Sequence, residues 1–406
     1  MFIIYSFCSF VTMRYNESTL MQYFFILGRQ PDLSLAEITA VFERDNIQCK
    51  LTLNNQEYAI FDVKKEINAK DLINKLGGTI KIGKILAETT SNLLAQTIQE
   101  LLPETDKKII FGINDYTGKN KPINLSKQIK KSSDKSMRFV YPQAGAKYLS
   151  SVATEKNKLL TPSGIEFNLF NCHTEALEGR HSILVGKTLA VQPFEKFSKF
   201  DYDRPSKDAE SGMLPPKVAT IMLNLSGAKT EDTLLDPFCG SGTILQQALL
   251  LGFENITGTD VSEKAIKDSR NNIAWLERQT GEKFHVSIEQ LDIRQLTKKI
   301  APKSIDAIVT EPFLGKPIWG NEPLEIIKKQ IVELETFYAQ TLEQLTAALK
   351  PHGTLVIIIP MFAVKKQLFK INAEKLFSDS GLKINGRWQY SRPGQHVIRN
   401  IYKLTK

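Results

Sequence analysis

The stretch Leu234-Leu235-Asp236-Pro237-Phe238-Cys239-Gly240-Ser241-Gly242-Thr243 decides the fold of this chain. Residues 233–236 form a short apolar run that predicts a buried strand, and residues 243–251 have the apolar spacing of a helix. Gly240 and Gly242 predict a tight turn between them, because glycine has no Cβ and leaves backbone N–H groups open to a ligand. A strand, a glycine turn and a helix in this order predict an α/β fold with a nucleotide site at the turn.

Two common phosphate-binding loops do not fit this turn. A P-loop needs a Lys followed by Ser or Thr, and no Lys follows Gly242. The dinucleotide-binding fingerprint needs a third glycine, and Leu245 stands at that position. The stretch as a whole resembles motif I of the S-adenosylmethionine-dependent methyltransferases that act on exocyclic amines of nucleic-acid bases. The resemblance implies that the cofactor contacts Asp236, Pro237, Phe238, Gly240, Gly242 and Thr243.

Two acids downstream of the turn fit the same resemblance. Residues 255–258 predict a second strand that ends in Asp260, where an acid about 20 residues after the glycine turn is expected to bond ribose hydroxyls. An Asp in this position can also be the N-cap of the next helix, although Ser262 is an alternative cap. A third strand leads to Asp292, which stands where the family places an adenine-binding carboxylate.

The sequence Thr310-Glu311-Pro312-Phe313 follows a fourth predicted strand at residues 306–309. Amino-methyltransferases carry Asp or Asn here, then two prolines and an aromatic residue. Their side-chain oxygen holds the target amine, and their aromatic ring stacks on the flipped base. Pro312 and Phe313 match this pattern, whereas Thr310 stands at the usual Asp or Asn position and Glu311 replaces the first proline. Either Glu311 or Thr310 is therefore expected to accept from the amine.

The implied reaction is direct methyl transfer from S-adenosylmethionine to an exocyclic nitrogen. It requires no metal and no covalent nucleophile, and a Pro-Cys pair for carbon methylation is absent near Pro312. Three other classes remain open: a DNA amino-methyltransferase, a nicotinamide oxidoreductase, and a non-catalytic RNA-binding protein with a degenerate site. The oxidoreductase fits the turn and Asp260, but it leaves Pro312 and Phe313 unexplained.

Composition describes a globular protein with polyanion-binding surfaces. The chain has 406 residues, of which 42% are hydrophobic and 24% charged, and this length is enough for two or three domains. Its four cysteines form no Cys-x-x-Cys pair, which argues against a zinc site or a disulfide framework and favours a cytoplasmic protein. The formal net charge of +9 is concentrated in residues 101–150 and 351–406. Two basic blocks predict that a polyanion bridges two surfaces.

The first half predicts two α/β units. Residues 1–20 are apolar near the start, without the positive charge of a signal peptide, and Met21 is an alternative start that makes them a possible over-read. Residues 21–90 have the order β-α-β-β-α-β of a ferredoxin-like unit. Residues 91–192 resemble a THUMP domain, the RNA-binding module of several tRNA-modifying enzymes. Residues 193–210 are expected to be a linker to a methyltransferase domain at residues 211–406.

Several segments together are similar to the THUMP-containing tRNA guanosine-N2 methyltransferases that modify the guanosine at position ten. They are residues 25–29, 33–37, 186–192, 201–205 and 391–399. The resemblance implies a Rossmann-like class I methyltransferase domain with a seven-stranded, mostly parallel sheet, S-adenosyl-L-methionine as cofactor and tRNA as partner. Expected RNA contacts are Lys127, Lys130, Lys131, Arg138, Arg392 and Arg399. The number of methyl groups added, the oligomeric state and the need for a small activator protein stay open.

Overall fold

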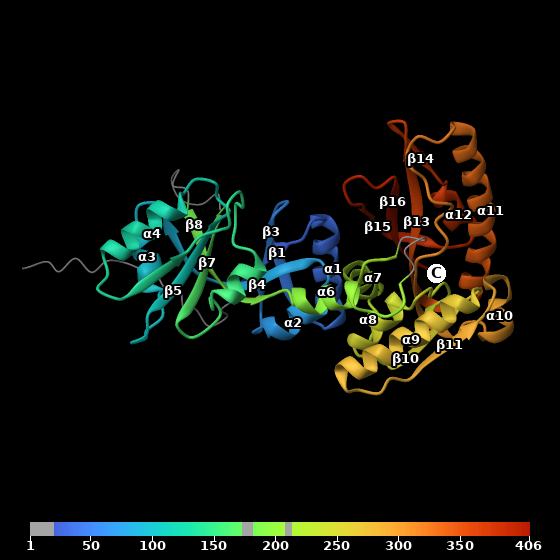
Figure 1. The fold of residues 1–406 in the computed structure, drawn as a ribbon, viewed down its shortest axis with the longest axis horizontal. Coiled ribbons are helices and arrows are strands. Elements are labelled where there is room, and N and C mark those ends of the chain that lie inside the picture. The colour runs from blue at the N-terminus through green and yellow to red at the C-terminus, as the bar shows by residue number, and fades with distance from the viewer. Residues whose placement is uncertain (1–19, 173–181, 208–212) are drawn as a thin grey trace, which may run out of the picture.

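The protein is described by a computed structural model that covers residues 20–172, 182–207 and 213–406. Figure 1 shows three units in a row, with the amino-terminal half on the left and the carboxy-terminal half on the right. The expectation for the first twenty residues lies almost wholly outside the described ranges. Within those ranges, no helix is both long enough and apolar enough to cross a membrane.

The first unit has the predicted order of elements. These are β1 (Met21–Leu27), α1 (Pro31–Arg44), β2 (Cys49–Asn54), β3 (Tyr58–Val63), α2 (Ala69–Lys75) and β4 (Thr79–Thr90). The strands pair antiparallel in the order β2-β3-β1-β4. Side chains alternate along β1, so that Tyr23 and Phe25 pack against α1 while Phe24 and Ile26 pack in a separate cluster on the other face. This alternation buries nearly the whole strand.

The second unit continues the sheet of the first. Its elements are α3 (Leu94–Glu100), β5 (Ile109–Asp115), α4 (Pro122–Lys131), β6 (Met137–Val140), α5 (Ser151–Lys156), β7 (Gly164–Asn171) and β8 (Ser182–Val191). The full order is β2-β3-β1-β4-β8-β7-β5-β6, and β4 pairs with β8 as far as Thr90. The expected boundary at residue 90 therefore falls within one continuous eight-stranded sheet.

The predicted linker contains a helix, α6 (Phe194–Tyr202). Its Phe197 and Phe200 are buried, and Phe200 lies edge-on to Trp275 with ring centroids 5.8 Å apart. Much of the segment that was predicted to be a linker is thus an amphipathic helix packed on the carboxy-terminal unit.

The carboxy-terminal unit is built on a second eight-stranded sheet. Its elements are α7 (Pro216–Ser226), β9 (Thr233–Asp236), α8 (Thr243–Leu250), β10 (Asn255–Asp260), α9 (Glu263–Thr280), β11 (Val286–Gln290), η1 (Ile293–Gln295), α10 (Leu296–Lys299), β12 (Ile305–Thr310), α11 (Leu324–Ala348), β13 (Leu349–Val364), β14 (Gln367–Lys370), α12 (Ala373–Asp379), β15 (Lys383–Tyr390) and β16 (Val397–Thr405).

Seven of its strands follow the order β11-β10-β9-β12-β13-β16-β15, and β14 pairs with β13 outside that path. The first five are parallel, and β16 runs antiparallel to both of its neighbours. The sheet thus has one strand more than the seven predicted. Helices cover both faces, so consecutive residues such as Leu234 and Leu235 enter two different core clusters.

The first unit packs on the third through α1 and α7. Leu33 and Ala40 of α1 belong to the same core cluster as residues of α7. Between them, the Glu37 carboxylate accepts hydrogen bonds from the N–H groups of Gly77 and Gly78 and from the Asn224 side chain, each 2.8 Å long. These contacts bury Glu37 fully and join the two units into one body.

Candidate active site

The predicted site residues meet at the carboxyl edge of the second sheet. Asp236, Asp260 and Thr310 are the last residues of β9, β10 and β12. These strands are parallel neighbours, so their ends lie at one edge. The structure therefore brings these three predicted residues together at one edge of the sheet.

Asp236 and Thr310 are hydrogen-bonded to each other inside this edge. The Thr310 hydroxyl donates to Asp236 Oδ1 over 2.7 Å, and both residues are buried. The Phe238 N–H donates to the same oxygen over 3.2 Å. The pKa of Asp236 is raised to about 7, mainly by burial and in addition by the negative charges of Asp260 and Glu311, while these two hydrogen bonds act in the opposite direction.

The glycine turn has the backbone conformation that the sequence predicted. Gly240 and Gly242 have φ values of 50° and 82°, which favour glycine. A Cβ on Gly242 would lie 2.5 Å from Ser269 Oγ, whereas a Cβ on Gly240 would have no atom within 4 Å. One side of the turn is thus packed on α9, and the other side is open to a ligand.

Asp260 connects β10 to the glycine turn. Its Oδ2 accepts from the Gly240 N–H over 3.0 Å, and its Oδ1 accepts from the Ser262 N–H over 2.9 Å. The N-cap of α9 is Ser262, whose side chain accepts from the Ala265 N–H over 3.2 Å. The alternative in which Asp260 caps the helix is therefore wrong, and its carboxylate stays beside the turn.

Asp292 lies next to the same edge but already has partners. The Leu291 N–H donates to the Asp260 carbonyl over 2.9 Å, which brings the following residue beside β10. The Asp292 carboxylate pairs with the Arg294 side chain and caps η1. This pairing holds the pKa of Asp292 below its usual value, so the group stays an anion.

Sequence reasoning missed Arg204 as a site residue. Its side chain is buried, and Nη1 donates to the Thr243 hydroxyl at the start of α8 over 2.6 Å. Nη2 lies 2.9 Å from the Met213 sulfur, and Nε has no partner among the described residues. A buried guanidinium behind the glycine turn fixes the position of Thr243. The only signal in the sequence was its place in the matching segment 201–205.

The motif after β12 is arranged around an ion pair. Glu311 Oε1 lies 2.6 Å from Arg399 Nε on β16, and the two side chains are 14% and 6% exposed. Burial raises the pKa of Glu311, although the positive charge of Arg399 and its hydrogen bond lower it. Pro312 is buried, whereas Phe313 is 57% exposed and its carbonyl accepts from the Tyr338 hydroxyl over 2.9 Å.

These contacts separate the two possible acceptors. The Thr310 hydroxyl is fully buried and donates to Asp236, so it is not available at the surface of the edge. Glu311 is the first residue beyond the strand and is partly exposed. Arg399 differs from its predicted role, because a guanidinium that is buried beside a carboxylate is not free to grip a phosphate in solvent.

The other predicted RNA contacts lie on the surface. Lys127, Lys130 and Lys131 are exposed on α4, whose opposite face buries Leu125 and Ile129. Arg138 on β6 and Arg392 in the loop before β16 are also exposed. Figure 1 shows α4 at the far left of the molecule, distant from the second sheet. The lysines therefore form a surface separate from the carboxyl edge.

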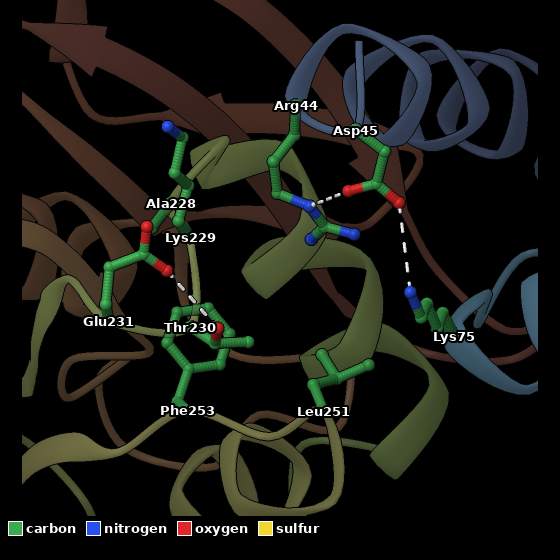
Figure 2. A pocket seen from close by; sticks show the side chains of 9 residues that line it. All are labelled: Arg44, Asp45, Lys75, Ala228, Lys229, Thr230, Glu231, Leu251 and Phe253. Atoms are coloured by element: carbon green, nitrogen blue, oxygen red, sulfur yellow. Dashed lines mark hydrogen bonds and ion pairs between the residues drawn. The ribbon is translucent and has the colours of Figure 1, made fainter. Parts of the chain in front are cut away.

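A pocket of about 300 Å³ lies elsewhere, between the first and third units. Figure 2 shows Arg44, Asp45 and Lys75 from the first unit facing Glu231 and Phe253 from the third. The charged groups of the first unit pair with one another, because Asp45 lies 2.8 Å from Arg44 Nε and 3.8 Å from Lys75 Nζ. None of its lining residues belongs to the predicted site. Among the described residues, no cluster of His, Cys, Asp and Glu could hold a metal ion.

The carboxy-terminal region is similar to a known family. Residues 204–377 match the family described as UPF0020: RMKL-like, methyltransferase domain. The matched region begins at Arg204 and ends within α12. It contains the glycine turn, Asp260, Asp292 and the motif after β12.

The chain also has curated relatives. The tRNA (guanine(10)-N2)-dimethyltransferase of Methanothermobacter thermautotrophicus is 35% identical over 136 residues, which cover 32% of this chain and 36% of the relative. The enzyme of the same description from Methanocaldococcus jannaschii is 28% identical over 185 residues, 44% of this chain and 47% of the relative. The matches thus span about half or less of these relatives. They confirm the predicted resemblance to tRNA guanosine-N2 methyltransferases, whereas the predicted THUMP domain stays an expectation.

A solved structure shares the fold over nearly the whole chain. The crystal structure of TrmN from Thermus thermophilus has a TM-score of 0.52 at 15% identity and covers 95% of this chain and 99% of that one. At this identity the likeness is one of fold. It supports a mixed α/β fold over nearly the whole chain.

Proposed function

We propose that this protein is an S-adenosylmethionine-dependent methyltransferase that methylates the exocyclic N2 amine of the guanosine at position 10 of tRNA. The observation that carries the proposal is the placement of Glu311 and the exposed Phe313 at the carboxyl end of β12, beside the glycine turn that follows β9. The partial matches to tRNA (guanine(10)-N2)-dimethyltransferases support this choice of substrate.

The residues at the edge fit the cofactor. Gly240 leaves open space above the turn, and Asp260 is fixed beside it by the Gly240 N–H. Each carboxylate oxygen has a further lone pair, so Asp260 can accept from ribose hydroxyls while it keeps its backbone contacts. Asp292 contacts the adenine of the cofactor in this proposal. S-adenosylmethionine, when bound, supplies a methyl group on a sulfonium that is a good leaving group.

Glu311 and Phe313 hold the base in this proposal. Phe313 is exposed and its backbone is fixed by Tyr338, so its ring offers a flat surface for a base that has left its stack. The Glu311 carboxylate accepts from the amine and stabilises the positive charge that develops on nitrogen. Arg399 Nε lies 2.6 Å from Glu311 Oε1 and keeps the carboxylate in one orientation. The protein thereby orients the reacting groups and needs no covalent intermediate.

The amino-terminal half supplies RNA affinity in the same proposal. We infer that residues 21–90 are a ferredoxin-like unit, that residues 91–192 are a THUMP domain and that residues 211–406 form a Rossmann-like class I methyltransferase domain. The antiparallel order β2-β3-β1-β4 and the exposed lysines of α4 support these assignments. We also propose that the protein is cytoplasmic.

Calorimetric titration and product analysis test the proposal. The full chain should bind S-adenosylmethionine and fail to bind NAD, which separates the methyltransferase from the oxidoreductase. Incubation with a tRNA transcript should then give N2-methylguanosine, detected by nucleoside mass spectrometry. Binding of NAD alone, or of neither cofactor, would overturn the assignment of the glycine turn.

A further inference from the structure

Strand β13 extends well past the edge that carries the active site. Its pairing with β12 ends at Ile357, opposite Thr310, but the strand continues to Val364. At about 3.3 Å per residue, this extension is roughly 20 Å long. It pairs with β16 on one side and turns back as β14. Figure 1 shows β14 at the top of the methyltransferase unit, beyond the rest of the sheet.

The tip of this hairpin consists of two exposed lysines in an unfavourable conformation. Val364 pairs with Gln367, which leaves Lys365 and Lys366 as a two-residue loop. Their φ values are 49° and 64°, whereas such a loop strongly prefers Asn-Gly. Non-glycine residues with positive φ are uncommon and are enriched at functional sites. The sequence thus keeps two positive charges where an uncharged pair would fold better.

An exposed tryptophan lies beside the tip. Trp319 is 80% exposed and stands in the same loop as Phe313. Its backbone is fixed, because the N–H groups of Trp319 and Gly320 donate to the Glu322 carboxylate and the Gly320 carbonyl accepts from the Lys365 N–H over 3.0 Å. A Cβ on Gly320 would lie 2.2 Å from the His396 ring, so the loop is also packed from the other side.

Protection of a sheet edge does not explain why two lysines and an exposed tryptophan lie together at this tip. Lysines on an edge strand commonly prevent pairing with another chain. Trp319 and Leu368 are 80% and 63% exposed near the same tip, however, and exposed apolar side chains promote association. A rigid aromatic ring next to fixed positive charge instead fits a nucleic-acid strand, whose bases stack and whose phosphates attract lysine.

We propose that Trp319, Lys365 and Lys366, named here the hairpin-tip surface, bind an unpaired segment of the substrate RNA next to the target nucleotide. The proposal rests on the proposed function, since it assumes that RNA enters the carboxyl edge of the sheet. Trp319 stacks on a base that neighbours the target, and the two lysines neutralise phosphates of the same strand. The hairpin-tip surface thus holds the strand while Phe313 receives the target base.

Two sets of variants distinguish a role of the hairpin-tip surface in RNA binding from a role in stability. Lys365→Asn combined with Lys366→Gly removes both charges and gives the loop its preferred sequence, so the thermal midpoint should stay equal or rise. Its affinity for a tRNA transcript should fall, and the salt slope should drop by up to about 0.7–0.9 per lost phosphate contact. The control is Lys298→Ser with Lys299→Ser, which removes two exposed lysines of α10 and should change the slope little.

Trp319→Leu should weaken tRNA binding by roughly 5- to 100-fold, the range for one lost base stack, while Trp319→Phe should restore most of it. Of the three tryptophans, Trp319 is 80% exposed, Trp275 is 8% exposed and Trp388 is half-buried, so tRNA should quench wild-type tryptophan fluorescence and Trp319→Phe should remove most of that quenching. S-adenosylmethionine affinity should not change in any variant.

The outcomes distinguish this inference from the proposed function. If wild-type protein methylates tRNA and both sets of variants behave like wild type, the hairpin-tip surface does not bind RNA and the proposed function stands. If wild-type protein neither binds nor methylates tRNA, both fail.

Discussion

Glu311 and Arg399 stand 88 positions apart in the chain, yet their side chains meet over 2.6 Å at the carboxyl edge of the second sheet. Both side chains are largely buried, so neither charge is stable there without a partner. The pair explains how a glutamate can occupy the first position after β12. The positive charge of Arg399 opposes the effect of burial, which raises the pKa of Glu311, and its guanidinium holds the carboxylate in a fixed orientation at the place where a target amine is expected.

The first prediction concerns the acceptor. Glu311→Gln should lower single-turnover methylation of tRNA by about 10²-fold, because a neutral amide stabilises a developing positive charge less well than a carboxylate. Affinity for tRNA should remain nearly unchanged. The variant leaves Arg399 without its carboxylate, which can cost up to about 3–5 kcal/mol, so the assay must run well below its measured thermal midpoint.

Thr310→Val is the contrasting variant. The Thr310 hydroxyl donates to buried Asp236, and its loss should cost about 1–3 kcal/mol in stability and weaken cofactor binding. At saturating S-adenosylmethionine the turnover should recover. A Thr310→Val protein that is folded, saturated and inactive, beside a fully active Glu311→Gln, would move the acceptor role to Thr310.

The second prediction concerns the cofactor ribose. Hydrogen bonds to a charged group contribute about 1.5–3 kcal/mol, so Asp260→Ala should weaken S-adenosylmethionine binding at least roughly tenfold in calorimetric titration. Ser262→Ala is a matched control, because Ser262 caps α9 directly beside Asp260. It should cost about 1 kcal/mol in stability and leave cofactor affinity unchanged. Equal affinities for all three proteins would refute the assignment of Asp260.

The third prediction is a dependence of stability on pH. Burial raises the pKa of both Glu37 and Asp236 to about 7, whereas unfolded carboxyls titrate near pH 4. The folded state therefore holds protons more tightly than the unfolded state, and these groups stabilise the fold least above pH 7. Without cofactor, the free energy of unfolding should fall by a few kcal/mol as pH rises from about 5 to 8. In denaturant titrations, Asp236→Asn should reduce the fall of the free energy of unfolding with pH. An unchanged fall would show that groups other than Asp236 cause the pH dependence.

The fourth prediction concerns the lysines of α4. Replacing Lys127, Lys130 and Lys131 together by Gln should lower tRNA affinity and reduce the salt slope by up to about 0.9 per lost phosphate contact. The control replaces Lys64, Lys65 and Lys70, which are exposed on the first unit, by Gln. Similar losses in both triple variants would indicate a general charge effect and not an RNA surface on α4.

Deleting residues 1–192 is not a clean form of this test. Leu33 and Ala40 share a core cluster with α7, and Glu37 bonds to Asn224 of the same helix. Truncation would expose that apolar face and would confound loss of RNA binding with loss of stability. The lysine variants leave this interface intact.

Local patterns predicted the parts of the site that depend on nearby residues. The glycine turn, Asp260 at the end of β10 and Ser262 as a cap follow from the residues on either side of them. The partner of Glu311 could not be found in this way, because Arg399 comes from a strand near the end of the chain and was expected to bind phosphate. Pairing across a sheet is a tertiary property that periodicity does not reveal.

The same distinction applies to the fold. The elements of the first unit were predicted in the correct order, because each strand and helix has a clear apolar period. The hairpin of β13 and β14 was missed, since its turn is Lys365-Lys366 and contains no glycine or asparagine. Helix α6 was missed because a short run rich in Phe, Lys and Asp resembles a linker in the sequence. Its buried aromatic residues pack against other parts of the chain, and this contact is not visible in the local pattern.

Methylation of two matched tRNA transcripts tests the central claim most directly. One transcript carries guanosine at position 10, and the other carries inosine there, which lacks only the exocyclic N2 amine. Single-turnover assays with labelled S-adenosylmethionine should give N2-methylguanosine in the first transcript and no methyl transfer to the second, with similar binding of both. Equal methylation of the two transcripts would show that another nucleotide or atom is the target, and methylation of neither would contradict the assignment of the protein as a guanosine-N2 methyltransferase.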